Sequence, residues 1–124
     1  MLALSLADPP SRPSRRGMPP DPAITVAVGL AALATGVESG AVLATSRGEA
    51  PIAYARQLAV YLAHVTLGYD LTRLSHVFGR DRATLRHALR RVEDDRDDPD
   101  FDQRVACLEG ILAPLRRLPG REGR

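Results

Sequence analysis

The side chains with the clearest chemistry are arginines and a histidine on one predicted helix, residues 82–96. An apolar stripe at helical spacing marks the inner side of this helix: Leu85, Ala88, Leu89 and Val92. A rotation of about 100° per residue places Ala83, His87 and Arg90 on the outer side. Arg86 flanks them. Guanidinium groups bond guanine through two parallel hydrogen bonds, and an alanine methyl contacts a thymine methyl. The pattern therefore predicts a face that reads the major groove of duplex DNA.

The same outer face is also typical of a solvated helix surface. Two features favour the DNA interpretation. Its basic residues lie in the N-terminal half of the helix, whereas acids such as Glu93 and Asp94 lie in the far half. A helix of this polarity is suited to enter a groove by its N-terminal end.

A short helix and a turn precede this face. Asp70 is placed to cap a helix over Leu71–Val77, and Phe78-Gly79 predicts a tight turn. A short helix, a glycine turn and a longer helix make a helix-turn-helix. Asp81 has two possible roles. It can be the N-cap of the second helix or one of the residues that recognise DNA bases, and the sequence does not decide between them.

The remaining elements are also helical. We expect a helix from Ala23 to a stop at Gly36, a short helix over 38–45, a loop over 46–51 and a helix over 52–67 that Gly68 ends. The buried face of the 52–67 helix is predicted to hold Ile52, Leu58, Ala59, Leu62, Val65 and Thr66, with Arg56, Gln57 and His64 outside it. Asp98-Pro99 begins a last helix, about 99–112, which Pro114 ends. The fold class is all-α, a bundle of about six helices.

Composition divides the chain into three parts. Residues 1–22 are rich in proline and arginine and are expected to form a disordered arm. Residues 23–118 are expected to form the helical domain, and residues 119–124 a flexible tail. The chain has 124 residues, enough for one domain, and only 4% aromatic residues, so its core must be aliphatic.

Several chemistries are excluded by composition. All 17 basic residues are arginine, which removes every lysine-dependent mechanism, including the P-loop of nucleotide-binding proteins. His64, His76 and His87 are too far apart for a metal-binding pair, and Cys107 is the single cysteine. No apolar run predicts a membrane span. We therefore expect a cytoplasmic non-enzyme with no cofactor, metal or nucleotide.

Charge is distributed unevenly along the chain. Residues 47–91 carry eight arginines and three acids, whereas residues 93–102 carry seven acids and one arginine. The basic part predicts a polyanionic partner. The acidic part, Glu93 to Asp102, leaves open a protein-interaction adaptor that docks a basic co-regulator or an RNA polymerase-associated protein.

Two segments carry a family resemblance. Residues 55–62, ARQLAVYL, and residues 74–92, LSHVFGRDRATLRHALRRV, resemble two motifs of the C-terminal domain (domain IV) of the DnaA replication initiator family, over about residues 23–113. The resemblance implies a helix-turn-helix DNA-binding fold. With the outward face, it implies base readout by Asp81, Arg82, Ala83, Arg86 and His87. It also implies contacts to the DNA backbone or minor groove by Arg47, Arg56, Gln57, His64, Thr84 and Arg90.

This chain departs from the family motif at two recognition positions, where Arg82 replaces a histidine and Ala83 replaces a threonine. We therefore expect a preferred DNA site other than the standard initiator box. Stand-alone proteins that resemble this domain point towards alphaproteobacterial transcriptional regulators of gene-transfer-agent or prophage-like clusters. The leading hypothesis is a sequence-specific transcriptional regulator at the nucleoid, a monomer or weak dimer. A replication-control protein that competes for initiator boxes is the alternative.

Overall fold

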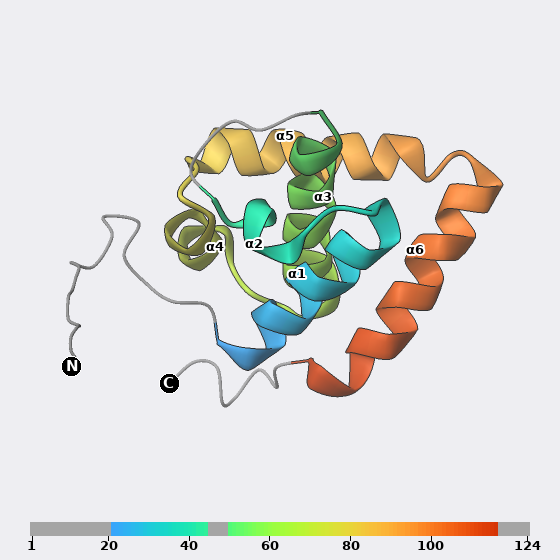
Figure 1. Ribbon diagram of the computed structural model, residues 1–124, viewed down its shortest axis with the longest axis horizontal. Coiled ribbons are helices and arrows are strands. Elements are labelled where there is room, and N and C mark those ends of the chain that lie inside the picture. The colour runs from blue at the N-terminus through green and yellow to red at the C-terminus, as the bar shows by residue number, and fades with distance from the viewer. Residues whose placement is uncertain (1–20, 45–49, 117–124) are drawn as a thin grey trace, which may run out of the picture.

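The computed structural model describes residues 21–44 and 50–116, which form six α-helices joined by short connections (Figure 1). No strand occurs among these residues, so the all-α prediction is confirmed. The helices are α1 (Pro22–Thr35), α2 (Ser39–Val42), α3 (Ala50–Tyr61), α4 (Leu71–Phe78), α5 (Arg82–Asp95) and α6 (Pro99–Leu112). A π-helical turn, Leu62–Thr66, extends α3, and a 3-10 turn, Ala113–Leu115, follows α6.

Helix α3 is the centre of the bundle. In Figure 1 it stands behind α1, while α5 crosses its upper end and α6 descends on the right. Its side chains Leu58 and Val60 are almost fully buried, as is Leu62 in the following turn. The core is mostly aliphatic, as predicted, but it also contains three aromatic side chains: Phe78, its largest fully buried side chain, Tyr61 and Tyr69. Because α3 contacts both α1 and α5, it holds the helix-turn-helix against the rest of the molecule.

The bounds of the first three helices agree only in part with those predicted from the sequence. Gly36 closes α1 in the left-handed conformation, with φ 76°, which glycine adopts without a steric penalty. The second helix is shorter than the predicted 38–45 and comprises only Ser39–Val42. Helix α3 begins at Ala50, inside the predicted 46–51 loop, because proline at position 51 is tolerated in a first helical turn.

The end of α3 differs from a regular helix. The π-helical turn over Leu62–Thr66 adds residues to one turn and so rotates the following side chains relative to the α-helical register. Thr66 is buried as predicted, but Val65 is 39% exposed, so its assignment to the buried face was wrong. Gly68, with φ 91°, then ends the segment.

The folded part begins before the predicted boundary at residue 23. Asp21 occupies the N-cap position of α1, but its side chain makes no capping hydrogen bond. Its carboxylate instead accepts hydrogen bonds from the Tyr69 hydroxyl at 2.7 and 2.8 Å. Arg73 in α4 forms an ion pair with the same carboxylate at 3.4 Å. Asp21 therefore joins the start of α1 to the start of α4. The rest of the predicted arm, residues 1–20, and the predicted tail, residues 119–124, lie outside the described residues.

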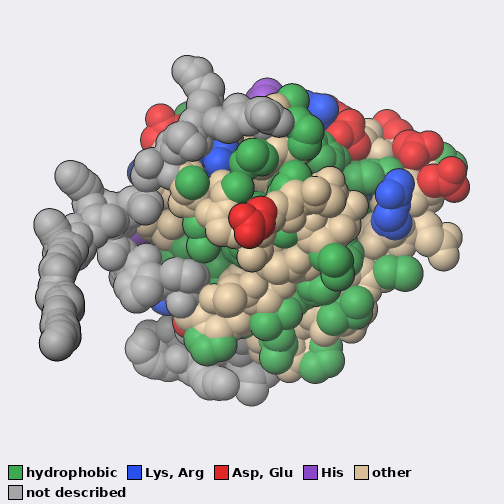
Figure 2. Space-filling model, in the orientation of Figure 1, with side chains coloured by type: hydrophobic (Ala, Val, Ile, Leu, Met, Phe, Trp, Pro, Cys, Tyr) green, Lys and Arg blue, Asp and Glu red, His purple; other side chains and the backbone are tan. Residues whose placement is uncertain are grey.

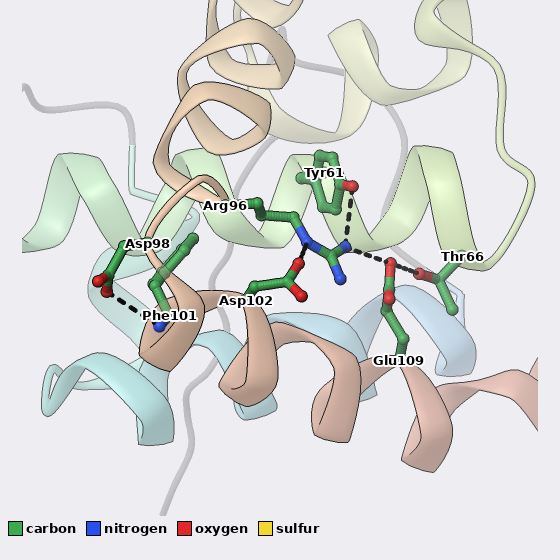
Figure 3. A network of polar contacts seen from close by, with 7 residues as sticks. All are labelled: Tyr61, Thr66, Arg96, Asp98, Phe101, Asp102 and Glu109. Atoms are coloured by element: carbon green, nitrogen blue, oxygen red, sulfur yellow. Dashed lines mark hydrogen bonds and ion pairs between the residues drawn. The ribbon is translucent and has the colours of Figure 1, made fainter.

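A polar cluster fixes the corner between α5 and α6 (Figure 3). The Arg96 guanidinium donates to Asp102, to Glu109 at 3.0 Å and to the Tyr61 hydroxyl at 3.1 Å. Burial lowers the pKa of Arg96, but these three hydrogen bonds outweigh it and hold the pKa above its ordinary value. As predicted, Asp98 caps α6, accepting from the Phe101 backbone N–H. Arg96 thus sets the direction in which α6 leaves α5.

Candidate nucleic-acid interface

Helices α4 and α5 form a helix-turn-helix whose joints are set by local sequence. The Asp70 side chain caps α4 by accepting from the Arg73 backbone N–H at 2.8 Å. Gly79 ends α4 with φ 65°, and Asp81 begins α5 by accepting from the Thr84 backbone N–H at 2.8 Å. A three-residue turn, 79–81, therefore separates the two helices. The cap predicted at Asp70 is present, and Asp81 is also a cap, which is one of its two proposed roles.

The outer side of α5 is the exposed face that the sequence predicts. Leu85, Ala88 and Val92 are buried, and Leu89 is half-buried. The five residues expected to read bases are all exposed: Asp81, Arg82, Ala83, Arg86 and His87. Thr84 and Arg90, expected on the backbone, are exposed as well. One contact orients this face, a 3.1 Å hydrogen bond from Arg82 Nη1 to Thr72 Oγ1 in α4.

The capping role of Asp81 is confirmed by its geometry. The hydrogen bond from the Thr84 backbone N–H holds the pKa of the Asp81 carboxyl below its ordinary value. The carboxylate therefore stays charged, with one oxygen engaged at the start of α5. It occupies the N-terminal end of the exposed face, beside Arg82.

A hollow of about 160 Å³ lies between α3 and α5, next to the exposed face. Thr84 lines it from α5, and Arg56 and Gln57 line it from α3. Two polar atoms here are buried and have no hydrogen-bond partner, Arg56 Nη2 and Gln57 Oε1. Buried polar atoms are nearly always paired in folded proteins, so such atoms beside an open hollow suggest that a ligand supplies the missing bonds.

Arg56 is buried, contrary to the prediction that it lies outside the buried face of its helix. Only 8% of it is exposed, and its Nε donates to the backbone oxygen of Val42 at 2.9 Å. Burial lowers the pKa of Arg56, and the nearby positive charge of Arg80 adds to the shift. The helical pattern missed this because α2, which covers the arginine, is distant in sequence.

Two other predicted backbone contacts, His64 and Arg47, do not line the described hollow. His64 is half-buried, and its Nδ1 lies 2.8 Å from the backbone oxygen of Tyr69. Since a carbonyl only accepts, Nδ1 carries the proton in this bond. Arg47 lies outside the described residues. The structure therefore brings Arg56, Gln57 and Thr84 together at the hollow, while His64 stands near the far end of α3.

Arg80 was absent from the predicted set, although it lines the hollow with Arg56. Its Nη1 donates to the backbone oxygens of Phe78 and Gly79, which holds its guanidinium over the turn. The available signal was its position, directly before the cap of the second helix. Because it lies in the turn of the helix-turn-helix, this arginine is positioned where α4, α5 and α3 meet.

The charges on α5 are separated along its length. Of the two i,i+4 pairs that the sequence offers, Arg91–Asp95 forms at 3.2 Å. Arg90 and Asp94 form no ion pair with each other in the described part of the chain. Arg91 also lies over the Tyr54 ring, 5.3 Å from its centroid. Arg91 is thus held against the protein, whereas Arg90 stays available on the outer face.

No group of three or more histidine, cysteine, aspartate or glutamate side chains within residues 21–44 and 50–116 could hold a metal ion. Each helix within these residues is either too short or too polar to span a lipid bilayer. Cys107 is an exposed thiol.

The sequence of this region also matches a known protein family. Residues 31–92 match the family described as the bacterial DnaA protein helix-turn-helix. The matched stretch runs from the second half of α1 to Val92 in α5, so it includes α3, the hollow and the helix-turn-helix.

Proposed function

The chain belongs to the bacterial DnaA helix-turn-helix family, which binds duplex DNA, and from this premise we propose that it is a sequence-specific transcriptional regulator. In this proposal α5 enters the major groove by its N-terminal half. The observation that carries the proposal is the hollow beside that half, where Arg56 Nη2 and Gln57 Oε1 lack partners.

Base readout falls to the exposed side chains at the start of α5. Arg82 and Arg86 are long enough to bond guanine edges, and the Ala83 methyl suits a thymine. His87, one turn after Ala83, follows on the same face. A groove-bound helix needs side chains of this kind without ion-pair partners, and among the described residues these two arginines form none.

Phosphate positioning falls to the hollow and its rim. Arg56 Nη2 is a donor, and Arg80 adds a second positive charge beside it. A phosphate oxygen at the rim satisfies the buried arginine donor, and the Gln57 amide can turn its NH₂ group towards the same anion. Thr84 supplies a hydroxyl from α5. Phosphate contacts fix the register of the protein on the duplex, while base contacts choose the sequence.

The preferred site differs from the standard initiator box in this proposal. Arg82 and Ala83 stand where the family motif has a histidine and a threonine, so the donors offered to the bases change. Each wrong base pair in a specific site costs about 1–3 kcal/mol. Two such changes are enough to move the preference to another sequence.

We further propose a location, gene targets and a second partner for this protein. The protein acts at the chromosome in the cytoplasm and performs no catalysis, which agrees with a family of non-catalytic domains. Its targets are genes of a gene-transfer-agent or prophage-like cluster. A co-regulator or an RNA polymerase-associated protein is the second partner, and the exposed acids near residues 93–100 are the surface available to it.

Selection of bound fragments from sheared genomic DNA tests this function. The purified protein is used at about 150 mM salt, where attraction to phosphates alone is weak. A short enriched motif upstream of one gene cluster is the expected result. Enrichment of initiator boxes near an origin instead supports the replication-control alternative. Retention of no motif contradicts sequence-specific binding and supports the adaptor.

A further inference from the structure

Arg91 lies on the side of α5 that faces α3, where its guanidinium covers the Tyr54 ring. It follows Thr84 by seven residues, which is close to two helical turns, so both side chains leave the helix in nearly the same direction. Thr84 lines the α3–α5 hollow, where a phosphate is expected to bind. A helix in the major groove has a phosphate backbone along each flank, so Arg91 is placed on the same flank, about 10 Å further along. Its position alone predicts another phosphate contact.

Contacts within the protein compete for this arginine. The Arg91 Nε donates to Asp95 Oδ2 at 3.2 Å, and the guanidinium carbon lies 5.3 Å from the centroid of the Tyr54 ring. The Tyr54 hydroxyl donates to the same Asp95 oxygen at 3.0 Å. Arg91, Asp95 and Tyr54 therefore contact one another pairwise, and these contacts join the C-terminal half of α5 to α3.

The tyrosine distinguishes this pair from an ordinary ion pair on a helix surface. An exposed pair four residues apart contributes little by itself. Here burial and the hydrogen bond to Asp95 raise the pKa of Tyr54, so its hydroxyl keeps its proton and donates to the carboxylate. The ring is held in turn by Phe101 of α6, with 6.0 Å between the two ring centroids. The carboxylate is thus fixed in position, and the guanidinium lies on an aromatic surface that attracts cations.

Arg91 differs from three other arginines of α5 in this respect. Arg82, Arg86 and Arg90 are exposed and form no ion pair in the described part of the chain. The Arg91 side chain is 51% exposed, so it is restrained by its partners rather than by burial. Figure 2 shows acidic side chains gathered where α5 ends and α6 begins, and Asp95 belongs to this acidic end of the helix. Release of Arg91 therefore requires no unfolding, only the loss of its carboxylate partner.

From the shared Asp95 oxygen, the Tyr54 ring and the position of Arg91 on the phosphate flank, we propose that Asp95 and Tyr54 withhold Arg91 from DNA. They are positioning residues that limit the number of phosphate contacts, and hence the affinity for duplex DNA of any sequence. This inference rests on the DNA binding of the proposed function and on its placement of α5, but not on a regulatory role.

Titration of a fluorescent duplex of random sequence with the full chain, at about 50 to 200 mM salt, tests the inference. Each phosphate contact contributes about 0.9 to the slope of log affinity against log salt. Asp95→Ala removes the carboxylate, so Arg91 is released. We expect the slope to steepen by about one unit and the affinity at about 0.1 M salt to rise about eightfold. Arg91→Ala is expected to leave the wild-type slope unchanged, because this arginine makes no DNA contact in the wild type.

The double variant separates the release of Arg91 from a simple change of net charge. Asp95→Ala makes the protein more positive in any background, but it can release the arginine only where Arg91 is present. In the Arg91→Ala background, the slope is therefore expected to stay at the wild-type value. The matched control is Glu93→Ala, which removes an exposed acid that forms no ion pair among the described residues of the chain. Its slope is expected to equal that of the wild type.

Tyr54→Phe tests the contribution of the tyrosine. It keeps the ring beneath Arg91 and removes the hydroxyl that holds Asp95, so the slope should steepen by less than with Asp95→Ala. A slope equal to that of the wild type overturns the part assigned to Tyr54. Circular dichroism at the titration temperature checks that each variant is folded. If Asp95→Ala is unfolded, Asp95→Asn takes its place, since it keeps an oxygen but not the charge.

Two results overturn the withholding of Arg91. One is a slope that falls by about one unit in Arg91→Ala, since the arginine then contacts DNA in the wild type. The other is an Asp95→Ala slope that equals the wild type or steepens equally in both backgrounds.

These outcomes differ from a failure of the proposed function, because a random duplex needs no preferred site. Absence of an enriched genomic motif contradicts sequence-specific regulation and leaves these slopes measurable. A wild type that binds no duplex even at about 50 mM salt overturns both the inference and the proposed function.

Discussion

Arg56 and Val42 are joined by a 2.9 Å hydrogen bond from the arginine Nε to the backbone oxygen, which links α3 to the end of α2. The same guanidinium keeps its Nη2 atom buried and without a hydrogen-bond partner at the α3–α5 hollow. The Nε atom of the guanidinium therefore stabilises the fold, while the Nη2 atom is free to bind a ligand. This division makes Arg56 the most informative residue for separating stability from binding.

Replacing Arg56 should affect both properties, in ways that can be measured apart. Arg56→Ala removes the bond to Val42 and leaves a carbonyl unpaired, so we expect a loss of about 1–3 kcal/mol in the free energy of unfolding. We also expect weaker binding to all DNA sequences alike. The slope of log affinity against log salt should fall by about one unit, as for one lost phosphate contact. Titration of a fluorescent duplex at several salt concentrations, below the melting temperature of the variant, measures this slope.

The matched control for this prediction is Arg104→Ala, an exposed arginine on α6 that does not line the α3–α5 hollow. It removes the same charge from the molecule but is not at the candidate interface. Its salt slope should equal that of the wild type. An equal change of slope in both variants contradicts a local phosphate contact at Arg56.

Arg86 is expected to choose the sequence rather than to set the overall affinity. It is exposed on α5 and forms no ion pair in the described part of the chain. Arg86→Ala should lose about 1–3 kcal/mol of discrimination at one base pair of the preferred site and little at the others. Affinities for single-base variants of the selected motif measure this. A uniform loss across the variants, as expected for Arg56→Ala, is the result that assigns Arg86 to the backbone.

Local sequence signals predicted most of the fold because helix ends are local. Asp70 and Asp98 cap the helices that the sequence assigned to them, and Gly36 and Gly79 end helices as expected. Asp81 is a cap, which is one of the two roles that the sequence left open. The exposed face of α5 follows from its helical period. These features depend only on residues that are close in sequence, so they can be predicted without knowledge of the fold.

Three features could not be obtained in that way, because they depend on contacts between distant segments. Arg56 is buried by packing between helices and by its bond to Val42, 14 residues away. Val65 turns outward because the π-helical turn changes the register of α3. The pairing of Arg80 with Arg56 at one hollow requires the crossing of α3 and α5. A helical pattern assumes a regular helix with one buried side and contains none of this information.

The Arg96 cluster should be the polar contact that matters most for stability at the α5–α6 corner. The arginine is 20% exposed and Glu109 is 26% exposed, so the pair is only partly screened by solvent. Arg96→Ala leaves both Glu109 and Asp102 without their cation, and we expect a loss of about 2 kcal/mol. For a domain of this size, the melting temperature should fall by about 10 °C.

The control is Arg90→Ala, which replaces an exposed arginine on the same helix and should change the free energy of unfolding by less than about 0.5 kcal/mol. Thermal unfolding followed by circular dichroism compares the two, and equal losses contradict a special role for Arg96.

Asp81 should make the stability of the protein fall in acid through one identified hydrogen bond. The Thr84 backbone N–H holds the folded-state pKa of this carboxyl below its ordinary value. A lowered folded-state pKa stabilises the fold above the unfolded-state pKa, about 3.9. This contribution is lost as the pH falls through the folded-state pKa.

The variant Asp81→Asn keeps a capping oxygen but has no charge to lose. The wild type should therefore be more stable than Asp81→Asn at pH 7, and the difference should shrink below about pH 4. Melting temperatures of both proteins from pH 2 to 7 test this. A difference that stays constant over that range assigns the effect to packing rather than to the charged cap.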